Sequence, residues 1–424
     1  MPYKWRVGDD VRAVGGDAGH GDFDAVVVGA GPAGSIAALV LARAGARVAL
    51  VDRSSFPRDK ACGDLIGPRG VQVLQELGVR IPNFGRGSDI LVVGPSGGRA
   101  RLPAFPGRTY ADHGIIAPRH VFDDILRNEA IAAGATPIEA RIVAASRGTD
   151  GSVDTLTASD GSAVRGRVVI GADGALSPIA HLTGMIDADA AMWGFAIRGY
   201  LRSDVPLPLL ALLDARPGRI FPGYGWLFPG AGGDANIGIG LALHRRQRPA
   251  ARLRTELERL CERLRANGDL PAGARPGPIT GGWLRMGGVG STPAARNVLL
   301  VGDAAGLVNP LQGEGIASAM MSGRLAADTV IADVADAGEA YAAALEARFA
   351  PFMVGASAIH DQMLRRARFT STTARVLTAP GVRRVVAGTW SLYLNGLVDG
   401  AMPRPSAWGA RLVQTAATRL ASER

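Results

Sequence analysis

Phe23 to Gly34 reads FDAVVVGAGPAG, a stretch that combines a short apolar run with closely spaced glycines. Its apolar run, Ala25 to Val28, is typical of a strand that is buried on both faces of a parallel sheet. The spacing Gly29-x-Gly31-x-x-Gly34 follows, and then the helical pattern SIAALVLARAG. The first glycine of such a triplet permits a tight turn, the second lets the backbone approach a pyrophosphate, and the third lets the helix pack on the strand. The helix start adds unpaired N–H groups that favour the phosphate.

A second strand, ARVALVD, ends at Asp52, 23 positions after Gly29. A carboxylate about 20 residues after the glycines is expected to bond a ribose hydroxyl. Strand, glycines, helix, strand and acid in this order predict a dinucleotide site, and a βαβ unit without phosphate is the weaker alternative. The glycines alone do not separate NAD from FAD.

Three later segments narrow the choice. RDKACGDL begins at Arg58, VVIGADG ends an apolar strand at Gly174, and NVLLVGDAAG ends another strand and is followed by GEGI, residues 313–316. Acids at such strand ends lie at the carboxyl edge of a sheet, where ligands of these folds bind. A simple strand-end cap is the alternative for either acid taken alone.

Together these segments resemble the FAD-dependent monooxygenase and reductase superfamily typified by p-hydroxybenzoate hydroxylase, over nearly all of the chain from residue 23. The resemblance implies an α/β fold with a Rossmann-like FAD-binding domain of the p-hydroxybenzoate hydroxylase/glutathione reductase type, a mixed β-sheet substrate domain and a helical C-terminal region. It places Asp303 at the ribityl chain or pyrophosphate, Asp173 near the pyrophosphate, and Arg119 reaching towards it. The FAD-binding residues that it implies are Gly29, Ala30, Gly31, Pro32, Ala33, Gly34, Asp52, Arg53, Cys62, Gly63, Asp64, Arg119, Asp173, Asp303, Gly313, Gly315 and Ile316.

A short aromatic stretch, PGYGWLFP at residues 222–229, lies far from the glycine motif. Because side chains alternate along a strand, Tyr224, Trp226 and Phe228 share one face. They either fill an ordinary core or line an apolar tunnel, and the polar tips of Tyr224 and Trp226 need partners in both cases.

Lys60–Asp64 (KACGD) and the Tyr-x-Trp-x-Phe-Pro element resemble the geranylgeranyl reductase family, and within it the actinobacterial menaquinone reductases. The chain departs from that pattern at Ala61, at residues 65–66, at Arg285 and in the proline position before Tyr224. The resemblance implies a reductase that saturates a carbon–carbon double bond of a prenyl chain, in a menaquinone side chain or a geranylgeranyl lipid. Reduced flavin would give hydride from N5, and the protein would supply a proton.

The candidate catalytic residues are Cys62 and Tyr224, and Tyr224, Trp226 and Phe228 are the candidate substrate-binding residues. A small buried hydrophobe is the alternative for Cys62. An FAD-dependent monooxygenase, a hydroxylase or epoxidase of an aromatic or polyketide substrate, is the alternative function, and a non-enzymatic flavoprotein is a third. A flavin halogenase needs a lysine beyond this segment, and no lysine follows Lys60.

The net charge of +9 does not indicate nucleic acid, because no basic run is interleaved with stacking aromatics. Two distant cysteines exclude a disulfide framework and fit a cytoplasmic protein. C-terminal arginines indicate either a solvated helix face or peripheral contact with the inner face of the membrane. The expected partners are a prenyl lipid or another apolar small molecule and an external electron donor, NAD(P)H or a reduced carrier protein. We expect no metal site, signal peptide or spanning segment.

The motif order predicts a discontinuous FAD domain. We expect a disordered tail over residues 1–22, the FAD-binding domain over 23–84, 110–185 and 296–330, and a substrate sheet over 186–295 with strands from 85–109. Residues 331–424 are predicted to be mostly helical.

Overall fold

The computed structural model describes residues 22–94, 97–103, 110–213, 223–243, 250–333, 335, 337–366, 372, 375, 383–399 and 405–422. The predicted tail, apart from Asp22, lies outside these residues, and so does Pro222.

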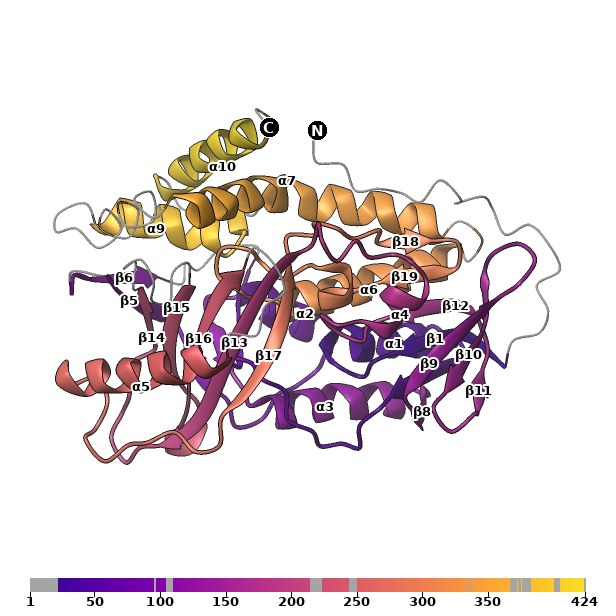
Figure 1. The fold of residues 1–424 in the computed structure, drawn as a ribbon, viewed down its shortest axis with the longest axis horizontal. Helices are drawn as coiled ribbons and strands as arrows, with labels where there is room; N and C mark the ends of the chain where they lie inside the picture. The colour runs from indigo at the N-terminus through magenta and orange to yellow at the C-terminus, as the bar shows by residue number, and fades with distance from the viewer. Residues whose placement is uncertain are drawn as a thin grey trace.

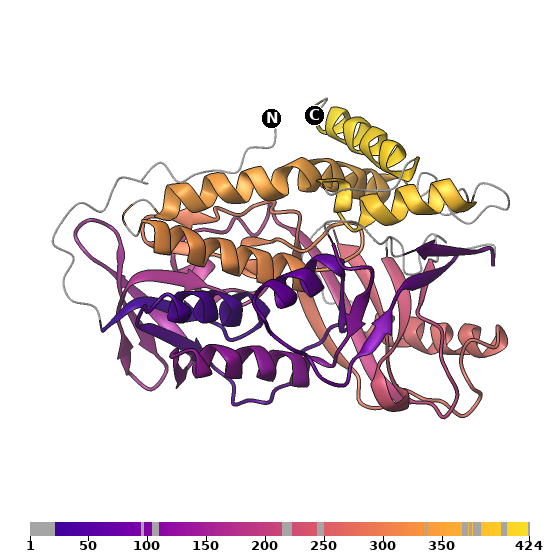
Figure 2. The same ribbon diagram turned by 180° about the vertical axis from the view of Figure 1, so that it is seen from behind.

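A six-stranded sheet carries the glycine motif, in the order β18-β19-β12-β1-β2-β8. Its neighbours pair in parallel except β18 and β19. Helix α1 (Pro32–Arg43) follows β1 and packs against α3 (Arg119–Ala132) and α6 (Ile316–Ala332). Figure 2 shows these helices in front of the strands. The strands are β1 (Phe23–Val28), β2 (Val48–Asp52), β8 (Thr136–Glu139), β12 (Gly166–Gly171), β18 (Ala294–Ala295) and β19 (Val298–Leu300).

A seven-stranded sheet lies beside the first layer (Figure 1), in the order β17-β13-β16-β15-β14-β5-β6. One face, with Leu227, Ile237 and Ile239, packs against helix α5 (Ala250–Ala266). The other face presents Trp226 and Phe228. The strands are β5 (Asp89–Val93), β6 (Arg99–Pro103), β13 (Met192–Arg202), β14 (Leu210–Leu213), β15 (Gly223–Pro229), β16 (Asp234–Leu243) and β17 (Thr280–Met286).

Two small sheets complete the β structure. One has the order β3-β7-β4 and the other β11-β10-β9. Two pairs of short strands cross the predicted domain boundaries: β4 pairs with β7, and β18 pairs with β19. The division into domains stays a prediction. The remaining elements are β3 (Leu65–Ile66), β4 (Gly85–Gly87), β7 (Gly114–Ile116), β9 (Ile142–Arg147), β10 (Val153–Ala158), β11 (Ala163–Val164), α2 (Pro68–Glu76), α4 (Pro178–Leu182), η1 (Ala231–Gly233) and η2 (Gly302–Ala305).

The C-terminal helices lie along both sheets, at the top of Figure 1. They are α7 (Ala337–Arg365), α9 (Arg383–Leu394), η3 (Leu397–Asp399) and α10 (Ser406–Ser422). Helix α9 packs against β6 and α10, and α7 packs against α6 and α10. The expected breaks at Pro380, Gly381 and Pro403 lie outside the described residues.

Helix α7 is long and apolar enough to cross a membrane by length and composition, whereas no spanning segment was predicted from the sequence. Tyr341 and Leu345 are both 0% exposed in the main core cluster, and the Tyr341 hydroxyl donates to the Leu300 carbonyl at 2.7 Å. We therefore interpret the face of α7 that carries Tyr341 and Leu345 as part of the core.

Candidate functional site

The glycine loop between β1 and α1 is shaped by contacts that no side chain tolerates. Gly29 has φ +107°, and a Cβ there would lie 2.3 Å from the Ala172 oxygen. A Cβ on Gly34 would lie 1.8 Å from the Gly29 oxygen, whereas one on Gly31 would meet only Arg58, at 3.6 Å. Helix α1 has no side-chain cap at Gly31 and begins with Pro32. The loop is therefore a tight cradle at the start of α1, where a helix end without a side-chain cap can bind a phosphate.

The Asp52 carboxylate lies beside this cradle. Its Oδ2 accepts the Ala30 N–H at 2.7 Å, and its Oδ1 accepts the Ser54 N–H at 3.0 Å. Ala30 is fully buried. Arg53, which follows Asp52 and was also predicted to bind FAD, is exposed. The contact with a ribose stays a prediction.

Arg119 bonds its own helix. Its Nε and Nη2 both donate to the Asp123 carboxylate at 2.7 Å. Burial acts to lower the Arg119 pKa, but Asp123 and Cys62 act to raise it, and the net change of the pKa is upward. Arg58 donates to the same carboxylate at 3.1 Å and lies beside Gly31. Arg58 is thus a candidate phosphate contact that was not among the predicted site residues, although the segment RDKACGDL begins with it.

The Asp173 carboxylate is hydrogen-bonded to groups that follow it closely in the sequence. Its carboxylate accepts the Ser177 hydroxyl and, at 2.9 Å, the Ile179 N–H at the start of α4. Burial raises its pKa to about 6. These contacts are those of a strand-end cap, the alternative given above for this acid. In the sequence, the Ser177-Pro178 pair shortly after Asp173 is the pattern that indicates such a cap.

The second strand-end acid, Asp303, faces the cavity described below. Lys60 Nζ lies 3.7 Å from its Oδ2. A Cβ on Gly315 would lie 3.3 Å from its Oδ1, so Asp303 is adjacent to the start of α6. Lys60 was not among the predicted site residues.

The loop 309–315 leads into α6, which begins at Ile316. Gly313 has φ +70°, and Glu314 Oε1 accepts the Ala317 N–H at 2.7 Å. Burial raises the Glu314 pKa to about 7. Glu314 thus caps the start of α6, and its carboxyl remains partly protonated near neutral pH.

Tyr224, Trp226 and Phe228 share one face of β15, as predicted. Ring centroids are 5.9 Å apart for Tyr224 and Trp226, and 6.2 Å for Trp226 and Phe228. The Tyr224 hydroxyl donates to the Gln312 carbonyl at 2.6 Å, and Trp226 Nε1 donates to Asn236 Oδ1 at 2.8 Å. Both polar tips therefore have partners.

Cys62 lies among these groups. Burial raises the pKa of its thiol, although Arg119 acts to lower it. Its Sγ accepts the Asp64 N–H at 3.4 Å, and its carbonyl accepts Asn236 Nδ2 at 2.8 Å. The adjacent Gly63 packs against the Phe228 ring, and a Cβ on this glycine would lie 3.2 Å from it. Cys62 therefore presents a protonated thiol beside the aromatic wall.

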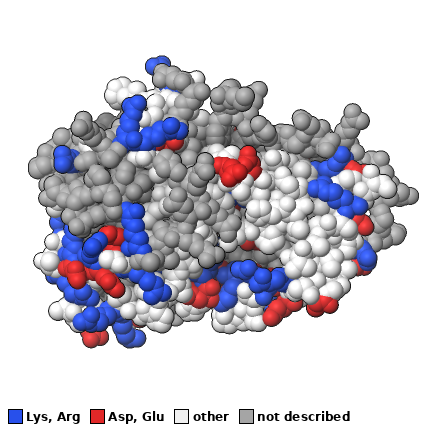
Figure 3. Space-filling model, in the orientation of Figure 1, with Lys and Arg blue, Asp and Glu red and all other residues white. Residues whose placement is uncertain are grey.

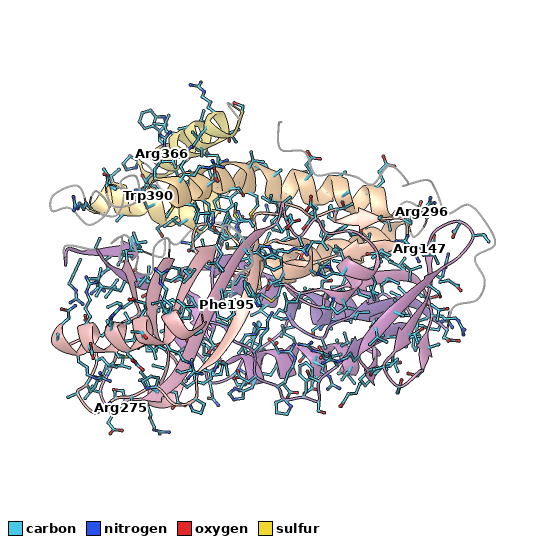
Figure 4. All side chains as sticks on the ribbon, viewed as in Figure 1. Arg147, Phe195, Arg275, Arg296, Arg366 and Trp390 are labelled. Carbon is cyan, nitrogen blue, oxygen red and sulfur yellow. The ribbon has the colours of Figure 1, made fainter. Side chains whose placement is uncertain are left out.

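A cavity of about 450 Å³ joins these parts. The glycine loop reaches it at Pro32, the seven-stranded sheet forms one wall, and α7 and α9 form another through residues such as His360 and Trp390. Trp390 is labelled on α9 in Figure 4. The predicted residues that line it are Pro32, Cys62, Gly63, Asp64, Arg119, Tyr224, Trp226, Phe228, Asp303, Gly313, Gly315 and Ile316. Those outside its lining are Gly29, Ala30, Gly31, Ala33, Gly34, Asp52, Arg53 and Asp173.

The described residues contain no group of three or more His, Cys, Asp or Glu placed to hold a metal ion, and both cysteines are free. Figure 3 shows basic and acidic side chains interspersed on the face that it presents.

Comparison with known proteins gives consistent matches. The model of the FAD binding domain family matches residues 22–347. The chain is 39% identical over 345 residues to the menaquinone reductase of Mycolicibacterium smegmatis, covering 77% of this chain and 81% of that one. It is 32% identical to digeranylgeranylglycerophospholipid reductase 1 of Methanopyrus kandleri, over 73% of this chain and 80% of that one.

Among solved structures, a geranylgeranyl bacteriochlorophyll reductase-like protein of Thermoplasma acidophilum superposes with a TM-score of 0.73. It has 22% identity and covers 95% of this chain and 98% of its own. That likeness shows a shared fold, and the sequence relatives show descent. The chain belongs to the FAD binding domain family and, within it, to the geranylgeranyl reductase family of FAD-dependent oxidoreductases.

Proposed function

We propose that this chain is an FAD-dependent reductase that saturates a carbon–carbon double bond of a prenyl chain, in a menaquinone side chain or a geranylgeranyl lipid. The observation that carries the proposal is the bond from Tyr224 to the Gln312 carbonyl, because it joins the aromatic strand to the loop before α6. An apolar wall and a cofactor loop thereby enclose one cavity. A thin, apolar substrate fits a cavity lined in this way.

The residues present fit FAD. The cradle at Gly29, Gly31 and Gly34 suits a pyrophosphate, with Arg58 beside it, and Asp52 next to the cradle remains the residue predicted to contact a ribose. The helix starts at Pro32 and Ile316 both line the cavity, so the positive dipole ends of α1 and α6 lie at it. When bound and reduced, FAD supplies the hydride. The chain must bind the alkene, exclude water and deliver a proton.

The walls perform the first two tasks. Trp226 and Phe228 are each 5% exposed, and their rings are stacked at 27°. A Cβ on Gly238 would lie 2.2 Å from Trp226 Cζ2, so this glycine in β16 makes room for the indole. The wall is therefore closely packed and largely shielded from solvent, which favours one orientation of a bound alkene.

The test uses purified, FAD-loaded protein reduced with dithionite under anaerobic conditions. Menaquinone and geranylgeranyl lipids are supplied separately, and products are weighed by mass spectrometry, with unreduced protein as the control. A gain of two hydrogens per saturated bond is expected only after reduction. An unchanged lipid, with an oxygen atom added to an aromatic substrate once air and NADPH are admitted, would replace the reductase with the monooxygenase alternative.

An external electron donor is part of this proposal, because each turnover oxidises the flavin. NAD(P)H and a reduced carrier protein are the two candidate donors. Anaerobic mixing of the oxidised holoenzyme with NADPH or NADH separates them. Rapid bleaching of the flavin identifies the nicotinamide, and persistent yellow colour identifies the carrier.

We also propose that the protein is cytoplasmic and contacts the inner face of the membrane through α10. The support is a pair of exposed apolar residues one turn apart, Trp408 (68% exposed) and Leu412 (50% exposed), next to Arg411. An interfacial helix combines such groups. Co-sedimentation with anionic vesicles should fall in a Trp408→Ser/Leu412→Ser variant, and equal binding by both proteins would contradict the contact.

A further inference from the structure

The Asp64 carboxyl has an uneven set of bonds. It is 1% exposed and belongs to the cavity wall, two residues after Cys62. Its Oδ2 accepts two hydrogen bonds, from the Tyr200 hydroxyl and from Asn236 Nδ2, both at 2.8 Å. Its Oδ1 is buried and has no hydrogen-bond partner among the described residues. A proton on this carboxyl therefore resides on Oδ1.

The cations near Asp64 do not prevent its carboxyl from staying protonated. Two guanidinium groups act on it, those of Arg119 and Arg198. Arg119 is paired with Asp123, and Arg198 is paired with Asp59. Each cation is thus already neutralised by another acid, and burial dominates. The pKa of Asp64 is raised to about 6.

The backbone supports a functional role. Asp64 has φ +64°, in the left-handed region that non-glycine residues rarely adopt. Such strain is concentrated at functional sites. Here it follows Gly63, which lies against Trp226 and Phe228, and it turns the carboxyl towards Tyr200 and Asn236 on the seven-stranded sheet. The strained position therefore serves the cavity.

We propose that Asp64 is the acid of this cavity and delivers the proton that one carbon of the substrate double bond receives. This inference rests on the proposed function. The alkene electron pair forms a C–H bond with the proton as the Asp64 O–H bond breaks, and the adjacent carbon receives hydride from reduced FAD. The substrate gains two hydrogens, the cofactor loses two electrons, and the carboxylate is reprotonated from solvent.

The two bonds to Oδ2 make Asp64 a better acid than its neighbours, because they stabilise the carboxylate that remains after proton transfer. The O–H group of Tyr224 is already engaged in a hydrogen bond to the Gln312 carbonyl. Burial makes the Cys62 thiol a weaker acid than usual, since its pKa is raised. Glu314 uses Oε1 to cap α6.

The test compares wild type with Asp64→Asn in anaerobic single turnovers of the dithionite-reduced holoenzyme. Asparagine tolerates the left-handed backbone and is isosteric, but its amide is not an acid. We expect normal FAD content and reduction, and product formation slowed by roughly 100-fold or more. Asp64→Glu should recover part of the rate. The control is Asp234→Asn, which removes an exposed carboxylate two residues before Asn236.

A second measurement does not depend on that variant folding. In wild type, the single-turnover rate should fall as pH rises through about 6, where Asp64 loses its proton. Tyr200→Phe removes one bond that stabilises the carboxylate, so the midpoint should move to higher pH. A wild-type rate and pH profile in Asp64→Asn, or an unshifted midpoint in Tyr200→Phe, would overturn the inference. If wild type itself saturates neither lipid, the failure lies in the proposed function.

Discussion

The Tyr224 hydroxyl donates to the Gln312 carbonyl across 2.6 Å, and this bond ties the aromatic strand to the loop before the flavin-side helix. The hydroxyl is an anchor in this arrangement. Tyr224→Phe should keep its FAD and lose about 5- to 10-fold in single-turnover rate, the value of one net hydrogen bond. Flavin absorbance and product mass spectra measure both quantities. A loss of 1,000-fold would identify Tyr224 as the acid instead.

The thiol of Cys62 should react slowly at neutral pH, because burial raises its pKa and keeps it protonated. In a Cys261→Ala background, where Cys62 is the remaining cysteine, alkylation at pH 7 should be at least about 10-fold slower than that of free cysteine. Mass spectrometry at timed intervals follows the adduct. Alkylation as fast as that of free cysteine would show an activated thiolate.

Gly34→Ala should give protein without flavin, because its Cβ would lie 1.8 Å from the Gly29 oxygen and the loop must move. The matched control is Gly273→Ala, where a Cβ meets nothing within 4 Å. The ratio of flavin to protein absorbance after purification is the measurement. Equal ratios in the two variants would remove the glycine loop from the cofactor site.

Gly238→Ala should destabilise the aromatic wall. Its Cβ would lie 2.2 Å from Trp226 Cζ2, whereas a Cβ on Gly240, on the same strand face, meets Ala196 at an ordinary 3.4 Å. We expect roughly 2 kcal/mol of lost stability for the first variant and less than about 1 kcal/mol for the second. Thermal unfolding, together with tryptophan fluorescence, distinguishes them, and equal melting temperatures would contradict this packing.

Protonation of Asp64 should also appear in stability. Its pKa rises from 3.8 to about 6 on folding, so the folded state binds this proton more tightly than the unfolded chain does. Its contribution is fully present below about pH 4 and is lost as pH rises through about 6, amounting to roughly 3 kcal/mol. The difference in unfolding free energy between wild type and Asp64→Asn, measured from pH 4 to 8, isolates this residue from Asp173 and Glu314. A difference that does not change with pH would mean that Asp64 titrates normally.

Local patterns predicted the parts of the site that local chemistry determines. The glycine cradle and the shared face of Tyr224, Trp226 and Phe228 follow from turn geometry and strand alternation, which act over a few residues. The fold class and the family were likewise predicted, because the motifs occur in a fixed order.

Other contacts depend on elements far apart in the chain. Asp64 meets Tyr200 and Asn236 only because β13 and β16 are neighbours in the sheet, and no spacing in the sequence predicts that. The same holds for α7 and α9 in the cavity wall. Arg119 differs, since its pairing with Asp123, four residues on, had a visible helical spacing that was not used.

The match to the FAD binding domain family ends at residue 347, while His360 on α7 and Trp390 on α9 belong to the cavity wall. The glycine loop and the part of the cavity wall that α7 and α9 provide after residue 347 are thus encoded by separate stretches of sequence. Substrate length and shape can change through substitutions after residue 347 without any change in the cradle. Exchanging this C-terminal stretch between relatives is therefore a route to new lipid preferences on an unaltered redox core.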